Sequence, residues 1–363
     1  SGYYFLLLLF SSVFDYYLAE LIYRYRGVKI IKRIFLILSV CLNLGILVYF
    51  KYLNFLIDIY NNFEMSKVEF KDVFLPIGIS FYTFQTMSYT IDVYRGRLKP
   101  AISFLDFAFY VSFFPQLVAG PIVRAIDFLP QIRKNTVITD YDVSRAVLLI
   151  TGGLIKKAII SDYISVNYVD RIFDTPFMYS SFENIIGIYG YALQIYCDFS
   201  GYSDMAIGLS LLLGFRLNIN FNLPYKAISM TDFWHRWHIS LSSWLRDYLY
   251  IPLGGNRKGR IRQMVNLMIT MLLGGLWHGA NWKYVVWGGL HGIALVFEKI
   301  FYKSNSFVIF NSNRIYRFLR VLLTFHFVLF CWIFFRANNL GEAIGIIKYI
   351  FSSKISMDVV LGV

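Results

Sequence analysis

Residues 231–240 (TDFWHRWHIS) and 274–282 (GGLWHGANW) bound the stretch that decides the fold and the chemistry of this chain. It holds three of the five histidines in the sequence, His235, His238 and His278. The first block combines histidines with charges and tryptophans, whereas the second sets His278 in an almost wholly apolar run. A polar side chain at bilayer depth is costly, so an ionisable residue in a spanning segment is a candidate functional residue. The first question is therefore whether the chain crosses a membrane.

The composition is that of a polytopic membrane protein. Hydrophobic residues make up 57% of the chain, aromatic residues 19% and charged residues only 16%, with a mean hydropathy of +0.55, against roughly 25% charged residues in soluble domains. The lengths of the apolar runs allow about ten spanning or re-entrant helices. We expect an all-α transmembrane bundle that forms a single membrane-embedded domain over residues 1–363.

The formal net charge of +13 is carried by short basic clusters between apolar runs, at residues 24–33, 95–99 and 257–262. This pattern is typical of cytoplasmic loops that obey the positive-inside rule, and no aromatic-basic nucleic-acid-binding fold is visible. The three cysteines are odd in number and lie far apart in apolar surroundings, which predicts core residues rather than disulfides or metal ligands. They are Cys41, Cys197 and Cys331.

The apolar runs and their interruptions predict the order of the helices. The first run has no methionine start and no signal-peptide pattern, so we expect the chain to begin inside a longer polypeptide. The run 105–123 is expected to be broken at its proline and glycine residues, and 223–255 is too polar to face acyl chains, so it should be interfacial or re-entrant. The other expected segments are 1–23, 34–60, 74–94, 140–163, two helices within 183–215, then 264–282, 285–301, 318–335 and the start of a helix pair at 340–363.

Asp198 and Asp204 are unusual because two carboxylates fall inside an apolar segment. They could line a polar substrate path, but helix capping and interhelical hydrogen bonding at a helix break is the favoured explanation. The adjacent Lys156 and Lys157 are expected to extend to an interface.

The motifs of several enzyme classes are absent. The chain has no G-x-S-x-G elbow, no Walker A loop and no G-x-G-x-x-G turn. Lys283 stands five positions after His278, so a His-x4-Asp acyltransferase signature is also missing. His235 and His238 would share one helical face, but no third metal ligand is evident. We therefore predict no metal site.

Acid-base catalysis by histidine remains, because imidazole titrates near neutral pH. His278 is the natural general base, since burial between glycines and tryptophans would keep it neutral. His291 and His326 are better explained as core histidines with satisfied hydrogen bonds. Close helix approach around His278 and His291 is predicted by two G-x-x-x-G pairs. These are Gly275 with Gly279 and Gly288 with Gly292.

Several motifs resemble the membrane-bound O-acyltransferase family over almost the whole chain. They are residues 113–122 (FFPQLVAGPI), 191–208 (YALQIYCDFSGYSDMAIG), 232–240, 244–256 (WLRDYLYIPLGGN), 276–279 and 332–337 (WIFFRA). They are most similar to the bacterial branch that contains the membrane subunits of alginate and peptidoglycan O-acetyltransferases. Family members usually carry extra helices at both ends.

The resemblance implies a helical fold with a tunnel through the membrane and two catalytic residues, which match His238 and His278. The expected donor is acetyl-CoA from the cytoplasmic side, and the expected acceptor is a hydroxyl reached from the periplasmic side. His278 would act as general base and His238 would orient or polarise. The family also implies the bacterial inner membrane as location, and a periplasmic SGNH-type partner that passes acetyl to peptidoglycan or to an alginate-like polysaccharide.

Further residues near these motifs are candidates for binding substrate. Trp277, Asn281 and the 275–279 backbone could stabilise the oxyanion. Arg257 and Lys258 could bind CoA phosphates, although a topogenic loop explains them more simply. The remaining substrate-binding candidates are Trp234, Arg246, Asp247, Asp198 and Ser200.

Three alternatives stay open from the sequence. The motif around His238, with Arg246 and Asp247, is shared with the D-alanyl transferase of teichoic acid synthesis. A transporter that moves an acyl group without chemistry would use His278 for proton relay or packing. A purely structural membrane subunit would leave the activity in the partner. The sequence decides neither the final acceptor nor the oligomeric state.

Overall fold

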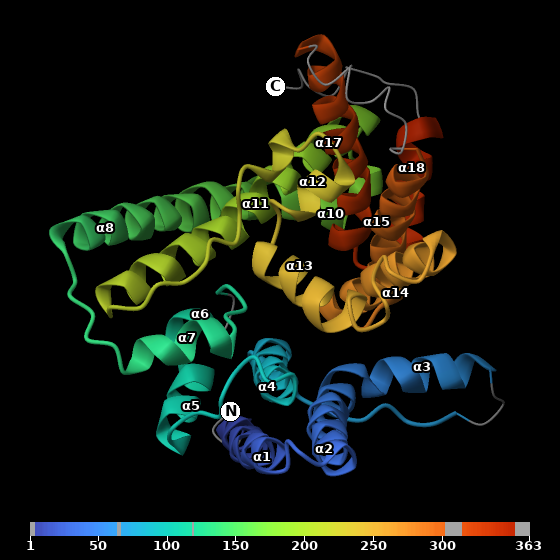
Figure 1. The fold of residues 1–363 in the computed structure, drawn as a ribbon. Helices are drawn as coiled ribbons and strands as arrows, with labels where there is room; N and C mark the ends of the chain where they lie inside the picture. Colours follow the sequence, from blue (N-terminus) through green and yellow to red (C-terminus); the bar gives the residue numbers. More distant parts are fainter. Residues whose placement is uncertain (1–3, 64–66, 118–119, 302–313, 353–363) are drawn as a thin grey trace. The chain divides into compact units, whose positions relative to one another are not determined.

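The computed structural model of the chain describes residues 4–63, 67–117, 120–301 and 314–352, and no strand occurs among them (Figure 1). The prediction of an all-helical protein is confirmed. The sequence predicts one domain, and contacts within the chain group the residues into two compact units. Unit 1 comprises residues 1–150 and 205–218, and unit 2 comprises residues 151–204 and 219–363.

Unit 1 is built from the N-terminal helices, drawn from blue to green in Figure 1. A broken segment at 105–123 is confirmed, since α5 and α6 are short and separate. Aromatic rings fill the core of unit 1, where Phe128 stacks on Phe215 with ring centroids 4.9 Å apart. Its elements are α1 Tyr4–Arg24, α2 Lys29–Leu47, η1 Val48–Tyr52, α3 Leu53–Phe63, α4 Ile79–Tyr94, α5 Phe104–Ser112, α6 Phe114–Leu117, α7 Ala125–Ile132 and most of α8 Asp140–Leu154.

A buried polar network joins α1, α2 and α4, which the sequence does not reveal. The Asp15 side chain is fully buried and accepts hydrogen bonds from Ser39 Oγ at 2.6 Å and from Asn43 Nδ2 at 2.7 Å. Thr86 on α4 donates to Asn43 Oδ1 at 3.0 Å. Buried polar groups need such partners because leaving one unpaired costs about 1–3 kcal/mol. The network therefore fixes how these three helices pack.

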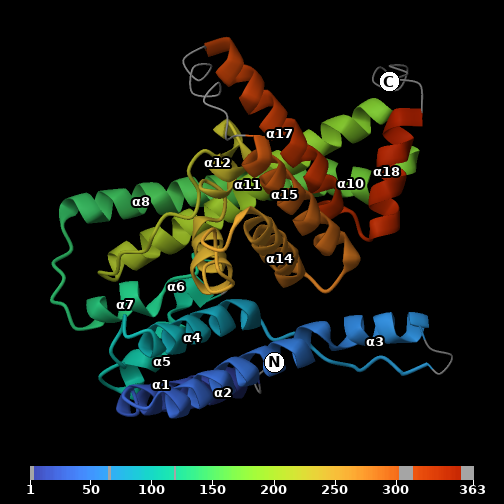
Figure 2. The same cartoon turned by 45° about the vertical axis from the view of Figure 1, so that its right-hand side comes forward.

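Unit 2 contains the histidines of interest, and its helices are drawn from green through yellow to red in Figure 2. The wider π-helical turns η2 and η3 interrupt the first part of this unit. Its elements are η2 Ile155–Ser161, α9 Asp162–Ile164, η3 Ser165–Val169, α10 Asp170–Asp174, η4 Pro176–Met178, α11 Ser181–Leu212 up to residue 204, η5 Pro224–Lys226, α12 Met230–Trp234, α13 Ile239–Leu245, η6 Arg246–Tyr250, α14 Arg260–His278, α15 Trp282–Phe301, α17 Arg314–Arg336 and α18 Leu340–Ser352.

The glycines of α14 and α15 allow the two helices to touch backbone to backbone. A Cβ added at Gly288 would overlap the Met271 carbonyl oxygen, and it would lie 3.1 Å from the Cα of Gly275. A Cβ at Gly275 would overlap the Tyr284 carbonyl oxygen. The predicted close approach around the histidines is therefore present, and it fixes the end of α14 against the start of α15.

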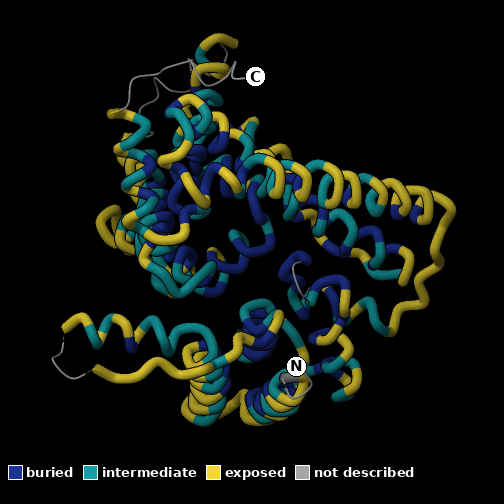
Figure 3. Tube along the Cα trace, turned by 180° about the vertical axis from the view of Figure 1, so that it is seen from behind, coloured by how far each residue is buried: buried dark blue, intermediate teal, exposed yellow. Residues whose placement is uncertain are grey.

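Four helices among the described residues are long and apolar enough to cross a membrane. They are Phe5–Arg24, Lys29–Phe63, Trp282–Phe301 and Arg314–Arg336. Exposed apolar side chains occur along all four, and Figure 3 colours the exposed parts of the trace yellow. Together with the composition, this identifies a membrane protein.

Several boundaries differ from the sequence prediction. Residues 183–215 do not form two helices, because α11 is one unbroken helix of 32 residues. The polar segment 223–255 is not one helix, since the short helices α12 and α13 are separated by a turn. Cys41 is exposed rather than in the core, while Cys197 and Cys331 are buried. Of the pair expected at 340–363, α18 is present and residues 353–363 lie outside the described part.

Candidate active site

A cavity of about 170 Å³ lies in unit 2 and is walled mostly by aromatic rings. Its walls come from α11, from the turn after α12, and from α14, α15 and α17. The lining residues are Ile195, Asp198, Phe199, Trp237, His278, Trp287, Trp332 and Phe335. Its only polar side chains other than tryptophan are those of Asp198 and His278, among the lining residues of the described structure.

His278 is the last residue of α14 and stands on the cavity wall. Its ring lies 5.2 Å from the ring of Trp287 and 5.2 Å from that of Phe335, measured between centroids. The helix ends here because Gly279 is extended and a side chain at that position would overlap the Tyr284 ring. The chain then turns directly into α15, so the imidazole is held at a tight corner between two packed helices.

His238 lies beside His278 but does not line the cavity. The two ring centroids are 6.5 Å apart, and only 1% of His238 is exposed. Its backbone adopts a left-handed conformation, with φ 44° and ψ 54°, at the start of α13. A residue other than glycine pays energy for this conformation, and such positions cluster at functional sites. The structure thus brings together two histidines that lie 40 positions apart in the sequence.

Asn220 fixes the protonation of His238 and is missed by the sequence analysis. Its Oδ1 accepts a hydrogen bond from the backbone N–H of Ser240 at 3.1 Å, so this atom is an acceptor. His238 Nδ1 lies 3.2 Å from the same oxygen and must therefore carry its proton. In the neutral ring Nε2 is then unprotonated, and no hydrogen-bond partner for it occurs among the described residues.

Burial also keeps His238 uncharged. This residue lies outside the four apolar helices, and burial lowers the pKa of its imidazole well below the ordinary value, with a smaller contribution from nearby His278. A neutral imidazole with a free lone pair can accept a proton or a hydrogen bond, but it has no second N–H to donate. The arrangement therefore supports an orienting role for His238 better than polarisation of a carbonyl.

Asp198 also lines the cavity, and its carboxylate is paired. Lys157 Nζ lies 2.6 Å from Asp198 Oδ1, and Lys156 Nζ lies 2.6 Å from Asp204 Oδ2. The two carboxylates thus make the interhelical contacts that the sequence favours, but no helix break occurs at this place. Ser200 on the same helix is buried and its hydroxyl has no partner among the described residues, but it does not line the cavity.

His235 and His238 do not share a helical face. The helix α12 ends at Trp234, His235 is exposed, and His238 opens the next helix. Trp234 packs against Trp287 and His291 rather than against His238. No group of three or more potential metal ligands occurs among the described residues.

The remaining histidines depart from the satisfied core type. His291 is fully buried among aromatic rings, but neither of its ring nitrogens has a hydrogen-bond partner in the described part of the chain. His326 is exposed, and its nitrogens lie 2.7 Å from Tyr189 Oη and 2.7 Å from the Leu322 carbonyl oxygen. The hydrogen bonding of His326 is satisfied as predicted, although its position is not in the core.

The other candidates fall into two groups. Trp277 packs next to His278, with ring centroids 5.0 Å apart, and Asn281 accepts the N–H of Lys283 at 3.0 Å, which caps the start of α15. Arg246 is largely exposed and pairs with Asp247 at 2.7 Å, away from the cavity lining. Arg257 and Lys258 lie in an exposed loop before α14.

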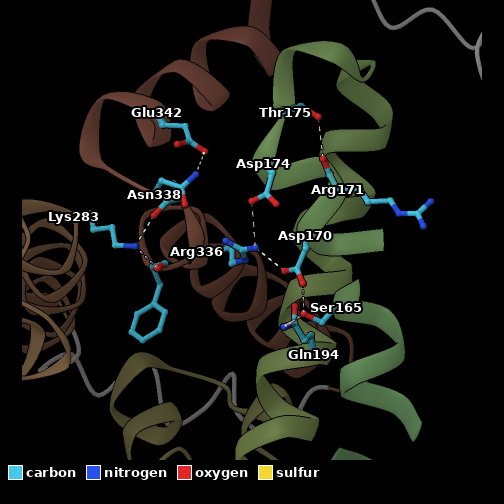
Figure 4. Close-up of polar contacts among 12 residues, drawn as sticks. Ser165, Asp170, Arg171, Asp174, Thr175, Gln194, Lys283, Arg336, Asn338 and Glu342 are labelled. Carbon is cyan, nitrogen blue, oxygen red and sulfur yellow. Dashed lines mark hydrogen bonds and ion pairs between the residues drawn. The ribbon is translucent and has the colours of Figure 1, made fainter. Parts of the chain in front are cut away.

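A polar cluster surrounds the C-terminal end of α17, next to the cavity residue Phe335 (Figure 4). Arg336 Nη2 lies 2.6 Å from Asp170 Oδ1, and Asp174 is 3.9 Å away. Lys283 Nζ donates to the carbonyl oxygen of Ala337 at 2.5 Å. These contacts tie α10 and α15 to the end of α17 and thereby hold the Phe335 wall of the cavity.

Apolar helices around a small aromatic cavity, with His278 on its wall and buried His238 beside it, define an integral membrane protein with an internal site. Comparison with known proteins gives the family. The model of the membrane-bound O-acyltransferase family, MBOAT, matches residues 30–341, and the chain therefore belongs to this family of acyltransferases.

Three relatives illustrate the range of the family. A peptidoglycan O-acetyltransferase of Helicobacter pylori is 39% identical over 94% of this chain and 69% of its own length. A probable alginate O-acetylase of Pseudomonas aeruginosa is 44% identical over 87% of this chain and 60% of its own length. A teichoic acid D-alanyltransferase of Bacillus subtilis is 30% identical over 70% of this chain and 67% of its own length. The chain thus spans about two thirds of the length of these relatives.

Proposed function

We propose that this protein is a membrane O-acetyltransferase that uses acetyl-CoA from the cytoplasm to acetylate a hydroxyl on the outer side of a bacterial inner membrane. The observation that carries the proposal is the position of His278, on the wall of a small aromatic cavity and beside a second, neutral histidine. The names of the Helicobacter and Pseudomonas relatives support acetyl as the transferred group.

In the proposed reaction His278 removes the proton of the acceptor hydroxyl, whose oxygen attacks the thioester carbonyl. The tetrahedral intermediate collapses with cleavage of the carbon–sulfur bond, and the thiolate of CoA takes the proton back from the His278 imidazolium. No enzyme nucleophile is needed, because holding both substrates in one enclosed site supplies much of the rate. His238 does not line the cavity and orients the neighbouring His278, while Asn220 holds the His238 ring in one tautomer.

The acceptor belongs to a cell-envelope polysaccharide in this proposal. Relatives are named for peptidoglycan and for alginate, so both are candidates. A periplasmic SGNH-type subunit would receive the acetyl group and deliver it to the polymer. The basic loop at Arg257 and Lys258 would face the cytoplasm, where CoA is available.

The test is release of CoA from acetyl-CoA by the chain in lipid nanodiscs, with and without the periplasmic subunit. His278→Ala should reduce turnover by a factor of about 10² to 10⁴, the range expected for loss of a general base. His238→Ala should reduce turnover less, because it removes an orienting group. A His278→Ala variant that is folded and turns over normally would exclude this residue as the base. No turnover with either preparation would favour transport without chemistry.

D-alanyl transfer is the second candidate, and the similarity to the Bacillus relative is the observation that favours it. Its donor would carry an ammonium group next to the thioester. Turnover of a D-alanyl thioester but not of acetyl-CoA would replace the first proposal with this one.

A further inference from the structure

The cavity has one strongly charged side chain among its lining residues in the described structure, and this is Asp198. The other walls are apolar or aromatic apart from His278. Because a charge acts more strongly in such surroundings than in water, the state of this one carboxylate governs which groups the cavity accepts.

The charge of Asp198 is partly cancelled by Lys157. Lys157 Nζ lies 2.6 Å from Asp198 Oδ1 and 2.8 Å from Asp162 Oδ1, so it is shared between two carboxylates. The side chains are 36% exposed for Lys157 and 46% for Asp198. Water therefore screens the pair only in part.

The lysine reaches the cavity wall because η2 approaches α11 closely. A Cβ added at Gly201 would lie 2.7 Å from the Gly153 carbonyl oxygen and 3.1 Å from the Lys157 nitrogen. A π-helical segment widens the backbone here, and π-turns often mark functional positions. The lysine is thus placed by the backbone of both elements.

The same two elements carry a second ion pair that serves as an internal control. Lys156 Nζ lies 2.6 Å from Asp204 Oδ2, the same distance as in the first pair. Neither Lys156 nor Asp204 lines the cavity. The two pairs have the same chemistry and differ in whether they face the acyl site.

We propose that the Lys157–Asp198 pair selects the acyl group by charge, which deepens the proposed function and rests on it. The carboxylate disfavours an anionic acyl group. The positive charge of the lysine offsets much of the negative charge of the carboxylate, so the site does not attract an acyl group that carries an ammonium. The site thereby accepts short neutral acyl groups such as acetyl and discriminates against aminoacyl groups.

The experiment measures CoA release from three thioesters of similar length, butyryl-CoA (neutral), β-alanyl-CoA (cationic) and malonyl-CoA (anionic), in nanodiscs. Each rate is divided by the butyryl rate of the same variant, which cancels differences in the amount of folded protein. Lys157→Met should raise the ratio of β-alanyl to malonyl turnover, because Asp198 is left uncompensated. Asp198→Asn should lower that ratio. The expected change is roughly three- to tenfold in each direction, the scale of a partly screened charge interaction.

The matched variants Lys156→Met and Asp204→Asn should keep the wild-type ratio, and so should Lys157→Arg, which retains the charge. If Lys157→Met does not fold, Lys157→Gln removes the same charge with a polar side chain. Turnover of butyryl-CoA with an unchanged ratio in both cavity variants overturns the charge selection while leaving the acyltransferase intact. A ratio that shifts equally in the control pair also overturns it. Absence of CoA release from any thioester, acetyl-CoA included, overturns the proposed function and the selection together.

Discussion

At the scale of single residues, the site depends on one asparagine that belongs to none of the motifs described from the sequence. Asn220 directs the proton of His238 to Nδ1 and leaves Nε2 free to accept. The histidines themselves could be predicted, because an ionisable side chain in an apolar run demands an explanation. The role of Asn220 could not be predicted, because this residue lies 18 positions before His238. It belongs to an irregular segment, in which the hydrophobic residues do not recur with a helical or strand period.

The buried, neutral His238 predicts a specific dependence of stability on pH. In the unfolded chain this imidazole binds a proton below its ordinary pKa of about 6.5, whereas in the folded chain burial lowers that pKa. Unfolding therefore takes up a proton in this range, and the free energy of unfolding must fall as the pH drops below about 6.5. For one proton the slope approaches about 1.4 kcal/mol per pH unit.

The variant that checks this is His238→Asn, which keeps a donor for Asn220 and cannot titrate. Unfolding followed in detergent between about pH 5 and 7.5 should show a shallower slope than in the wild type. His235→Asn, which changes an exposed ring, is the control and should keep the slope. Equal slopes in all three proteins would show that His238 is not the group that takes up the proton.

At the scale of elements, the structure shows where local preference gives way to packing. Serine, glycine and aspartate in residues 198–204 are poor helix formers, which is why the sequence indicates a break. The helix α11 nevertheless continues, because both aspartates gain lysine partners and Gly201 lets η2 approach. These partners come from 40 to 50 positions away, beyond what a local pattern can report.

The contact between α14 and α15 should be sensitive to a single methyl group. Gly288→Ala places a Cβ against the Met271 carbonyl oxygen, so the helices must separate. We expect a loss of about 1–3 kcal/mol, as for other overpacked cores, together with reduced turnover because His278 shifts. Gly289→Ala is the matched control, since its Cβ would lie 3.5 Å from Leu272 Cδ2, an ordinary contact. The measurements are thermal unfolding and CoA release on both variants. Equal transition temperatures and equal turnover for Gly288→Ala and Gly289→Ala would contradict this prediction.

At the scale of the whole molecule, the class of fold follows from composition, whereas the internal polar networks do not. Apolar runs of sufficient length predict the helices directly. Asp15 sits in such a run and gives no sign of its partners, Ser39 and Asn43, which lie on the next helix. Which side chains meet between two helices depends on how each helix is rotated about its axis. A single sequence does not give this rotation.

Removal of the Asp15 carboxylate should destabilise unit 1. Asp15→Ala removes the acceptor that Ser39 Oγ and Asn43 Nδ2 share. Ser39 keeps Thr90 Oγ1 at 3.0 Å as an acceptor, but one of the two Nδ2 hydrogens of Asn43 stays unpaired in the core, at a cost of about 1–3 kcal/mol. The transition temperature in detergent should fall accordingly. Asp58→Ala, on the exposed side of α3, should leave it nearly unchanged. Similar transition temperatures for both variants would mean that the network does not hold these helices together.

The bilayer should protect the exposed thiol of Cys41. This residue lies on α2 within a helix apolar enough to span the membrane, while Cys197 and Cys331 are buried in the protein. In nanodiscs a charged maleimide should label none of the three, and an apolar maleimide should label Cys41 alone. Mass spectrometry of the labelled protein reads this out directly. Labelling of Cys41 by the charged reagent would show that water rather than lipid covers this face.

The aromatic walls of the cavity give the protein an optical reporter of its own. Three of its seven tryptophans, Trp237, Trp287 and Trp332, line the cavity. Trp287 lies within 5.2 Å of the His278 ring, measured between centroids. Since a protonated imidazole quenches the emission of a neighbouring indole, each proton that His278 gains or loses should change the intrinsic fluorescence. Stopped-flow emission could therefore follow the occupancy and protonation of this site in time, without any label.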